Sequence, residues 1–233
     1  FLPTATGDND SYIVRFYSIF TRLKCIPSHI EFFNRTIDIE NHIMDQDIVF
    51  VGGGNTKSML AVWREWKLDQ YLLNAYKRGA ILCGVSAGAI CWFEQGITDS
   101  WASNLNVMDC MGFLQGCCCP HYDGELDRKP TVEKFLKDAK INSCYALDDG
   151  AAIHYKNGQV HVVISFHEGA NVYEVSYDNC DWWCHGCLRA PLLGWLCKPV
   201  FWWSVSLGYI GSQRGGFCFI GGGCRVWGTD IGF

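Results

Sequence analysis

The chain has little charge, little proline and no long hydrophobic run. Charged side chains make up only 18% of its 233 residues, and they leave a net charge of -5. A surface of this balance lacks the basic face that follows nucleic-acid phosphates, so we expect no nucleic-acid partner. No apolar run reaches the roughly 18 residues of a membrane-spanning helix, so we expect no membrane association.

We also expect no secretory leader. The chain opens with Phe1-Leu2-Pro3, which has neither a methionine nor a charged leader segment. We interpret these residues as belonging to the end of a strand. Cysteine is abundant, with 14 residues, but several, such as Cys83 and Cys91, fall in predicted core segments. We interpret these as reduced, buried thiols and predict a cytoplasmic protein.

Strand-like and helix-like segments alternate along the first part of the chain. Short, nearly uncharged runs typical of buried strands occupy residues 1–5, 29–33, 47–51 and 80–83. Helical spacing of apolar residues marks 11–24, 36–44, 59–66 and 68–77. This alternation predicts an α/β fold with a doubly wound, mostly parallel sheet flanked by helices.

One stretch carries the pattern of a catalytic turn. Gly84-Val85-Ser86-Ala87-Gly88 reads G-x-S-x-G, follows a predicted strand and precedes an apolar segment, 89–94, that we expect to be helical. In such a strand-to-helix turn, Cβ atoms at the glycine positions would collide with neighbouring backbone, and the serine stands exposed. We therefore predict that Ser86 is a nucleophile.

A second glycine-rich turn follows the strand at 47–51. Gly52-Gly53-Gly54 matches neither a dinucleotide fingerprint nor a P-loop, so a nucleotide site is weakly supported and we expect no cofactor. Parallel strands bring their carboxyl ends to one edge of a sheet, which places this turn beside Ser86. Its backbone N–H groups, with that of Ala87, would form an oxyanion hole. A plain loop entering a helix is the alternative.

A serine nucleophile at neutral pH needs a base, and the chain has seven histidines. His121 follows Pro120 in a polar loop after an apolar run, where catalytic residues are common. The others lie in predicted strands, helices or the tail: His29, His42, His154, His161, His167 and His185. The residues alone leave the choice of His121 open.

Four motifs in order resemble the peptidase E family. They are V-G-G-G-N-T at 51–56, G-V-S-A-G-A at 84–89, I-T-D-S at 97–100 and P-H-Y-D-G-E at 120–125. Members of this family are serine dipeptidases that remove N-terminal aspartate. Their fold is related to that of flavodoxin-like class I glutamine amidotransferases and of cyanophycinases. The amidotransferases use cysteine at the turn where this chain has serine, so glutaminase chemistry is not expected.

The resemblance extends from Phe1 to about Tyr177 and assigns roles to individual residues. It implies Ser86 as the nucleophile and His121 as the general base. It implies oxyanion-hole donors at Gly53, Gly54 and Ala87.

The acid that orients the histidine is less determined. The resemblance points to Asp99, and Glu94 is the alternative, because some relatives use glutamate. On a straight helix Glu94 would lie about 12 Å along the axis from Ser86. Asp99 follows Gly96 and is freer to fold back, so we favour Asp99. Both carboxylates are equally compatible with solvated positions at a helix end.

Recognition of an aspartyl substrate needs polar partners, because a desolvated carboxylate without a partner is costly. Arg128 is the candidate cation, although a surface pairing with Asp127 or Glu125 would also explain it. Asp123 or Glu125 would receive the substrate amine. Asn55 and Thr56 would hold the substrate backbone.

The last part of the chain has a different character. From about Asn179 it is dense in tryptophan, cysteine and glycine and shows no sustained period, so we divide the chain at 1–178 and 179–233. Cys184 and Cys187 form a single C-x-x-C, which is weak evidence for a metal site, and we predict none. A divergent or non-native extension, such as the product of a shifted reading frame, is the preferred interpretation. If exposed, its aromatic residues predict association.

The sequence therefore predicts a serine dipeptidase that acts on short peptides with N-terminal aspartate and requires no metal or organic cofactor. The expected partner is a small peptide substrate, and the protein is expected to be a monomer or homodimer. Two alternatives are a cyanophycinase-like hydrolase of another acidic or isopeptide substrate and a non-catalytic binding module that retains the fold. Labelling of Ser86 by a fluorophosphonate would distinguish an enzyme from a binder.

Overall fold

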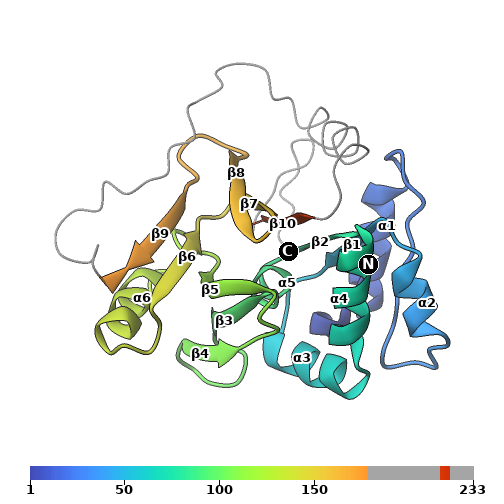
Figure 1. The fold of residues 1–233 in the computed structure, drawn as a ribbon, viewed down its shortest axis with the longest axis horizontal. Helices are drawn as coiled ribbons and strands as arrows, with labels where there is room; N and C mark the ends of the chain where they lie inside the picture. The colour runs from blue at the N-terminus through green and yellow to red at the C-terminus, as the bar shows by residue number, and fades with distance from the viewer. Residues whose placement is uncertain (178–215, 221–233) are drawn as a thin grey trace.

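The computed structural model describes residues 1–177 and 216–220 (Figure 1). Its helices are η1 (Thr4–Thr6), α1 (Asp10–Phe20), α2 (Ile39–Met44), α3 (Thr56–Glu65), α4 (Leu68–Arg78), α5 (Ala87–Ile90) and α6 (Arg128–Lys137). Its strands are β1 (Ile48–Val51), β2 (Ile81–Val85), β3 (Phe93–Thr98), β4 (Asn106–Asp109), β5 (Leu114–Cys119), β6 (Ser143–Leu147), β7 (Ala151–Lys156), β8 (Gln159–Ser165), β9 (Val172–Ser176) and β10 (Gly216–Ile220).

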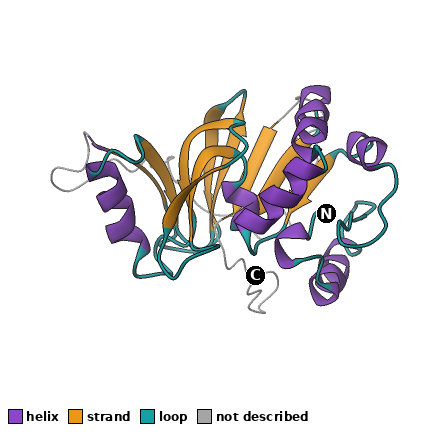
Figure 2. Cartoon of the chain, turned by 90° about the horizontal axis from the view of Figure 1, so that it is seen from below, coloured by secondary structure: helices purple, strands orange, loops and turns teal. Residues whose placement is uncertain are grey.

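The strands pair into two five-stranded sheets. One has the order β1-β2-β10-β7-β8 and the other β4-β3-β5-β6-β9. Parallel pairs join β1 to β2, β2 to β10, β3 to β5 and β5 to β6, whereas antiparallel pairs join β10 to β7, β7 to β8, β3 to β4 and β6 to β9. Figure 2 shows the strands in the middle of the molecule with helices on either side. The expected α/β class is confirmed.

The helices cover the two ends of the strand layer. Helices α1 and α2 lie at one end and α6 at the other, while α5 lies at the centre (Figure 1). The largest core side chains, Trp63, Trp92 and Phe93, are fully buried around that centre. The short α5 therefore sits in a rigid apolar surrounding, which fixes the turn that precedes it.

Three local predictions were wrong. Residues 29–33 form no strand, because the N–H groups of Phe32 and Phe33 donate to the Asp8 carboxylate instead of to a neighbouring strand. The first segment makes a single parallel bridge, from Leu2 to Val51, before η1 begins. The apolar segment 89–94 is not one helix: α5 ends at Ile90, and β3 begins at Phe93. Short apolar runs suit either element, and here strand pairing decides.

A β-hairpin follows β6. Strands β7 and β8 pair antiparallel around Asn157 and Gly158, whose φ angles of 54° and 75° are those of a tight hairpin turn. Residues 178–215 and 221–233 lie outside the described residues, and with them the C-x-x-C of Cys184 and Cys187, where no metal site was predicted. Within the described part of the tail, β10 runs parallel to β2 and antiparallel to β7. The boundary at residue 178 stays a prediction.

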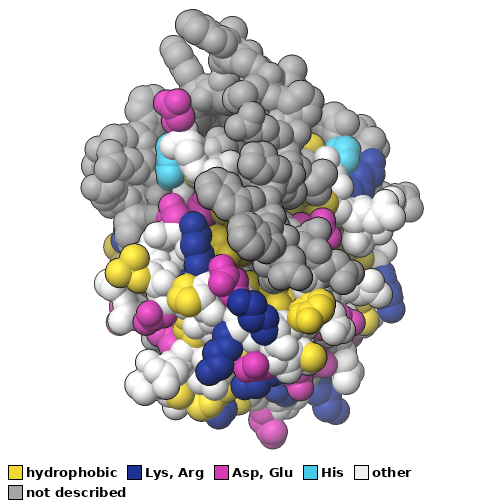
Figure 3. All heavy atoms as spheres, turned by 90° about the vertical axis from the view of Figure 1, so that its left-hand side faces the viewer, with side chains coloured by type: hydrophobic (Ala, Val, Ile, Leu, Met, Phe, Trp, Pro, Cys, Tyr) yellow, Lys and Arg dark blue, Asp and Glu magenta, His cyan; other side chains and the backbone are white. Residues whose placement is uncertain are grey.

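The surface at the α6 end mixes charges of both signs. Figure 3 views that face and shows basic and acidic side chains interspersed rather than gathered into one patch. In the described segments of the chain, no helix has both the length and the hydropathy that crossing a bilayer requires.

Candidate active site

The turn between β2 and α5 holds Ser86 in a conformation that serine rarely adopts. Its φ and ψ angles are 53° and -113°. A Cβ atom on Gly84 would lie 2.3 Å from the carbonyl oxygen of Gly88, and one on Gly88 would lie 2.3 Å from that of Val51. Both glycines are thus required by close backbone contact, as the sequence predicted, and the fold supports a strained serine at the end of the strand.

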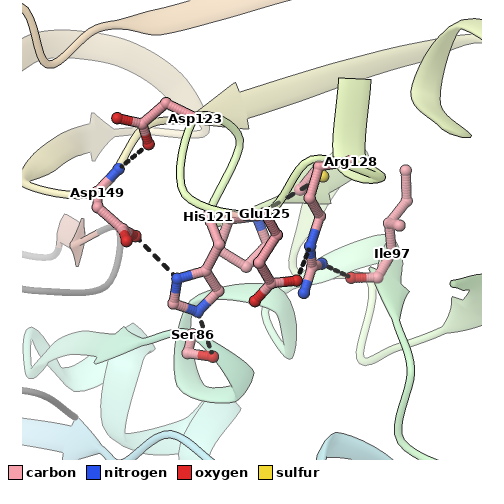
Figure 4. Close-up of polar contacts among 9 residues, drawn as sticks. Ser86, Ile97, His121, Asp123, Glu125, Arg128 and Asp149 are labelled. Carbon is pink, nitrogen blue, oxygen red and sulfur yellow. Dashed lines mark hydrogen bonds and ion pairs between the residues drawn. The ribbon is translucent and has the colours of Figure 1, made fainter. Parts of the chain in front are cut away.

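His121 reaches this serine from the end of β5. Its Nε2 lies 3.1 Å from Ser86 Oγ, although 35 residues separate the two in sequence. His121 follows Pro120 and has a φ of 57°, so the chain turns sharply and directs the imidazole back toward the serine (Figure 4). Only 18% of the His121 side chain is exposed. The histidine that the resemblance favoured is therefore the one beside Ser86.

The carboxylate beside His121 is Asp149, which the sequence analysis did not consider. Asp149 Oδ1 lies 2.8 Å from His121 Nδ1, in the turn between β6 and β7 (Figure 4). A hydrogen bond at Nδ1 leaves Nε2 free to accept a proton from Ser86. The serine, histidine and aspartate thus form a continuous chain of hydrogen bonds.

The structure does not bring Asp99 or Glu94 to His121, so the expectation for the acid is corrected. Glu94 lies on β3 rather than on a helix, and its Oε2 accepts a hydrogen bond from the Gly116 N–H at 2.9 Å. Asp99 follows β3 and lines a cavity of about 640 Å³ together with Glu125 and Asp127. Both acids were expected at or beyond the end of a longer helix, whereas α5 is only four residues long.

A tight loop after His121 supports Asp149. Asp123 Oδ1 accepts a hydrogen bond from the Asp149 backbone N–H at 2.8 Å (Figure 4). A Cβ atom on Gly124 would lie 2.7 Å from Asp149 Oδ2, so this glycine allows the carboxylate to approach the loop. In the described structure Asp123 therefore orders the turn that carries Asp149, rather than facing a substrate amine through this oxygen.

Asp148, next to Asp149, is a buried carboxyl group. Its Oδ2 accepts hydrogen bonds from the Asn171 N–H at 3.0 Å and the Tyr173 hydroxyl at 3.2 Å. Burial raises the pKa of Asp148, the nearby Asp123 raises it further, and the two hydrogen bonds partly oppose the shift. The adjacent aspartates thus differ in role: Asp148 anchors the turn and Asp149 faces the histidine.

The glycine loop after β1 lies directly against Ser86. A Cβ atom on Gly53 would be 3.2 Å from the Ser86 Cβ. The Gly53 N–H donates to the Tyr12 hydroxyl at 3.1 Å, so one of the three expected oxyanion donors is already bound. The N–H groups of Gly54 and Ala87 have no partner among residues 1–177 and 216–220. These two remain as candidate donors.

The residues predicted to bind substrate are mostly engaged in the fold. Arg128 is only 4% exposed, and its Nη1 donates to the Ile97 carbonyl at 2.9 Å while its Nε donates to Glu125 Oε2 at 2.8 Å (Figure 4). Burial alone would lower the pKa of Arg128, but Cys119 and Glu125 outweigh it and raise the pKa, so the guanidinium stays charged. The pairing of Arg128 with Glu125 that the sequence left open is the one observed.

Asn55 and Thr56 begin helix α3 and join it to a neighbouring loop. Asn55 Oδ1 accepts from the Ser58 N–H and its Nδ2 donates to the Ser100 carbonyl, each at 2.8 Å. The Thr56 N–H donates to the Ser100 hydroxyl at 3.0 Å. Both residues thus fix the segment that follows Gly54.

The cysteines near the site are poor nucleophiles. Cys91 is fully buried, and this burial raises its pKa well above the ordinary value. Cys83 is half-buried on β2, with its Sγ 3.5 Å from the Val49 carbonyl oxygen. Across the described part of the chain, no three His, Cys, Asp or Glu side chains group as metal ligands would.

Comparisons with known proteins found a matching family model and similar sequences. The model of peptidase family S51 matches residues 1–163. The chain is 48% identical over 176 residues to the uncharacterized peptidase YgaJ of Bacillus subtilis (strain 168), covering 75% of this chain and 76% of that protein. It is 30% identical over 126 residues to proteins named Peptidase E from Salmonella arizonae and Citrobacter koseri, covering 50% of this chain and 55% of each.

A solved structure shares the fold. A crystal structure from Listeria monocytogenes EGD-e, described as a candidate peptidase E protein, aligns with a TM-score of 0.55 and 19% sequence identity. The alignment covers 70% of this chain and 83% of that one. At that identity the likeness shows the fold alone. The match to the family model and the identity to YgaJ show that the chain belongs to peptidase family S51, a family of serine peptidases.

Proposed function

We propose that the chain hydrolyses short peptides through an acyl-enzyme on Ser86, with His121 as general base and Asp149 as the acid of the triad. The observation that carries this proposal is the hydrogen-bond chain from Ser86 Oγ through both ring nitrogens of His121 to Asp149 Oδ1, with distances of 3.1 and 2.8 Å. A binding module would have no need of a strained serine joined to a histidine and a carboxylate in this order.

In the proposed reaction, Ser86 Oγ attacks the peptide carbonyl carbon as its proton passes to His121 Nε2. Asp149 stabilises the resulting imidazolium through Nδ1. The N–H groups of Ala87 and Gly54 stabilise the oxyanion. His121 then gives the proton to the departing amine as the C–N bond breaks. Water repeats the sequence, with His121 taking its proton, to release the acid and restore Ser86.

We propose peptides with N-terminal aspartate as the first substrates to test, supported by the resemblance of the motifs to peptidase E and by the 30% identity to proteins of that name. Glu125 is the best-placed acceptor for the substrate's ammonium group. Arg128 holds Glu125 Oε2, and Glu125 Oε1 has no partner among the described residues. A carboxylate fixed in this way loses little freedom on binding.

One observation favours a second candidate, a peptidase for a different first residue. Arg128 is paired with Glu125 and bound to the Ile97 carbonyl, so its charge is already neutralised where the resemblance would have it bind an aspartyl side chain. Glu125 also lines a cavity with Asp99 and Asp127, in which Lys134 is the basic lining residue; neither Ser86 nor His121 lines this cavity. This charge balance suits a neutral or basic first residue better than an acidic one.

The deciding experiment compares hydrolysis of Asp-Leu, Leu-Leu and Lys-Leu by the wild type and Ser86→Ala, with EDTA present to silence contaminating metallopeptidases. Cleavage should fall by about 10⁴-fold or more in Ser86→Ala. Ser18→Ala, an exposed serine on α1, is the matched control and should be unaffected. The preferred dipeptide distinguishes the two substrate candidates.

Fluorophosphonate labelling separates the enzyme from the binding module. An active serine peptidase should incorporate the label at Ser86 even if none of the three dipeptides is its substrate. Folded protein that neither cleaves the dipeptides nor takes up the label would refute the proposed function.

A further inference from the structure

Tyr12 lies far from the site in sequence but contacts its glycine loop. It belongs to α1, and its hydroxyl accepts the Gly53 N–H at 3.1 Å. A Cβ atom on Gly52 would lie 2.7 Å from Tyr12 Cε1, so the ring is in close contact with the loop. Tyr12 precedes Gly53 by 41 residues, so the position of this loop against Ser86 depends on a side chain far away in the chain.

Backbone hydrogen bonds also hold the loop at the residues on either side of Gly53 and Gly54. The Gly52 N–H donates to the Leu2 carbonyl at 3.1 Å, and the Asn55 N–H donates to the Ala5 carbonyl at 2.7 Å. With Gly53 bound by Tyr12, Gly54 has the one N–H of residues 52–55 that lacks a partner within the described residues. The loop is thus fixed on both sides of the N–H that the proposed oxyanion hole would use.

Gly54 is held in a conformation that does not allow a side chain. Its φ is 136°, and a Cβ atom there would lie 2.3 Å from the Ala5 carbonyl oxygen. An oxyanion donor must lie about 2.7 to 3.1 Å from the developing charge. Because Gly53 is packed against the Ser86 Cβ, a shift of the loop relative to Ser86 would change the distance from the Gly54 N–H to the oxyanion.

Packing alone does not explain a hydroxyl at position 12. Tyr12 packs against a buried aromatic cluster in which Phe1 and Phe16 stack, and its ring meets Phe1 edge to face at 5.2 Å. Phenylalanine would fill the same space. A hydroxyl brought into apolar surroundings costs free energy unless it is hydrogen-bonded, and its hydrogen bond with Gly53 is one that phenylalanine would lack.

We propose that Tyr12 is a positioning residue: its hydroxyl binds the Gly53 N–H and so orients the loop for Gly54 to serve, with Ala87, as an oxyanion donor. The proposal rests on the proposed function, since an oxyanion forms only if Ser86 attacks a carbonyl. It also assigns different roles to the two neighbouring glycines: a structural role to Gly53 and a catalytic role to Gly54.

The test removes the hydroxyl of Tyr12 and keeps its aromatic ring. Tyr12→Phe is compared with Tyr17→Phe, which makes the same change on the same helix, where the Tyr17 hydroxyl bonds His29 Nδ1 at 2.8 Å. In Tyr12→Phe, kcat should fall about tenfold with KM unchanged, since a displaced donor costs less than the 10²–10³-fold of a lost one. Tyr17→Phe should keep wild-type kcat.

Two further measurements distinguish a positioning role of Tyr12 from a general loss of structure in Tyr12→Phe. A peptide aldehyde, which forms a charged tetrahedral adduct with the serine, should bind Tyr12→Phe weaker by the same factor as the loss in kcat/KM, while a non-covalent product should bind as before. Hydrogen exchange at the Gly53 amide should quicken in Tyr12→Phe and stay unchanged in Tyr17→Phe. The exchange measurement needs no activity.

The outcomes separate the inference from the function on which it rests. Folded wild type that neither cleaves the dipeptides nor takes up the label would refute the proposed function, and hydrogen exchange at the Gly53 amide would still report on the Tyr12 contact. Unchanged kcat, unchanged exchange, or equal losses in both tyrosine variants would overturn the positioning role. If Tyr12→Phe fails to fold, 4-fluorophenylalanine at position 12 keeps the volume of the hydroxyl but accepts hydrogen bonds weakly, and the same split between kcat and KM applies.

Discussion

Two turns at the ends of strands build the candidate site, and they differ in what determines their shape. The elbow at 84–88 is fixed by its own glycines, which pack against the Gly88 and Val51 carbonyls. The turn at 148–150 is fixed by contacts from elsewhere, including Asp123 and Tyr173. A locally determined turn leaves a motif in the sequence. A turn held by distant partners leaves none, although both place a reacting group at the end of a strand.

The largest expected effect tests whether the second turn supplies the acid. Asp149→Asn should lower kcat by about 10³ to 10⁴-fold, because the amide no longer stabilises the imidazolium or fixes the correct tautomer. Asp99→Asn is the matched control and should stay within about twofold of wild type. Steady-state kinetics on the preferred dipeptide would measure both. Equal losses at the two positions, or a larger one at Asp99, would restore the original assignment.

Substitution of a glycine in the elbow at 84–88 should instead lower the stability of the protein. Gly88→Ala places a Cβ atom 2.3 Å from the Val51 carbonyl oxygen, so the backbone must move, and the free energy of unfolding should drop by about 3 kcal/mol or more. Urea denaturation would measure this.

Gly112→Ala is the control for the elbow variant. Gly112 has a φ of 70° but nothing within 4 Å of an added Cβ, so only the backbone strain of about 1 kcal/mol is expected. Similar losses at both glycines would show that close packing does not determine the elbow.

A smaller effect distinguishes the two roles considered for Asp123. Asp123→Ala removes the acceptor for the Asp149 N–H, and should lower kcat about three- to tenfold, a range that corresponds to loss of one hydrogen bond. Asp123→Asn keeps an oxygen acceptor and should recover most of the rate. KM should stay constant in both. A rise in KM in both variants would instead support contact with the substrate amine.

Sequence patterns predicted the parts of the candidate site whose residue types are determined by local steric contacts. Ser86 and its flanking glycines were predictable because the clash that selects glycine occurs within the turn and its adjoining strand. His121 needed the resemblance, since a histidine after a proline is not by itself diagnostic. Most helices and buried strands followed from periodicity, but the end of α5 did not, because Phe93 joins a strand by pairing with Leu114.

Asp149 and Tyr12 were missed for a common reason. Each contacts the candidate site through a hydrogen bond to a residue far away in the chain, at His121 and Gly53 respectively. The one available signal for the acid was its place after an apolar strand, in Asp148-Asp149-Gly150, where parallel strands direct functional groups. No pattern marks Tyr12, since its ring fits the apolar face of α1 whether or not the hydroxyl is used.

The smallest expected effect concerns how the second turn responds to pH. Burial raises the pKa of Asp148 in the folded protein, so the native state binds a proton more readily than the unfolded chain does. The free energy of unfolding should therefore fall as pH rises from the ordinary aspartate value through the raised pKa, and level off above it. In Asp148→Asn this contribution disappears.

Urea denaturation of the wild type and Asp148→Asn between pH 3.5 and 7 would measure the difference between them. The stability of the wild type relative to the variant should decline across that window. A constant difference would mean that Asp148 titrates alike in both states, and an increase with pH would mean that the folded turn prefers the ionised form. Either result would mean that hydrogen bonds to the carboxylate, such as those from the Asn171 N–H and the Tyr173 hydroxyl, offset the effect of burial on Asp148.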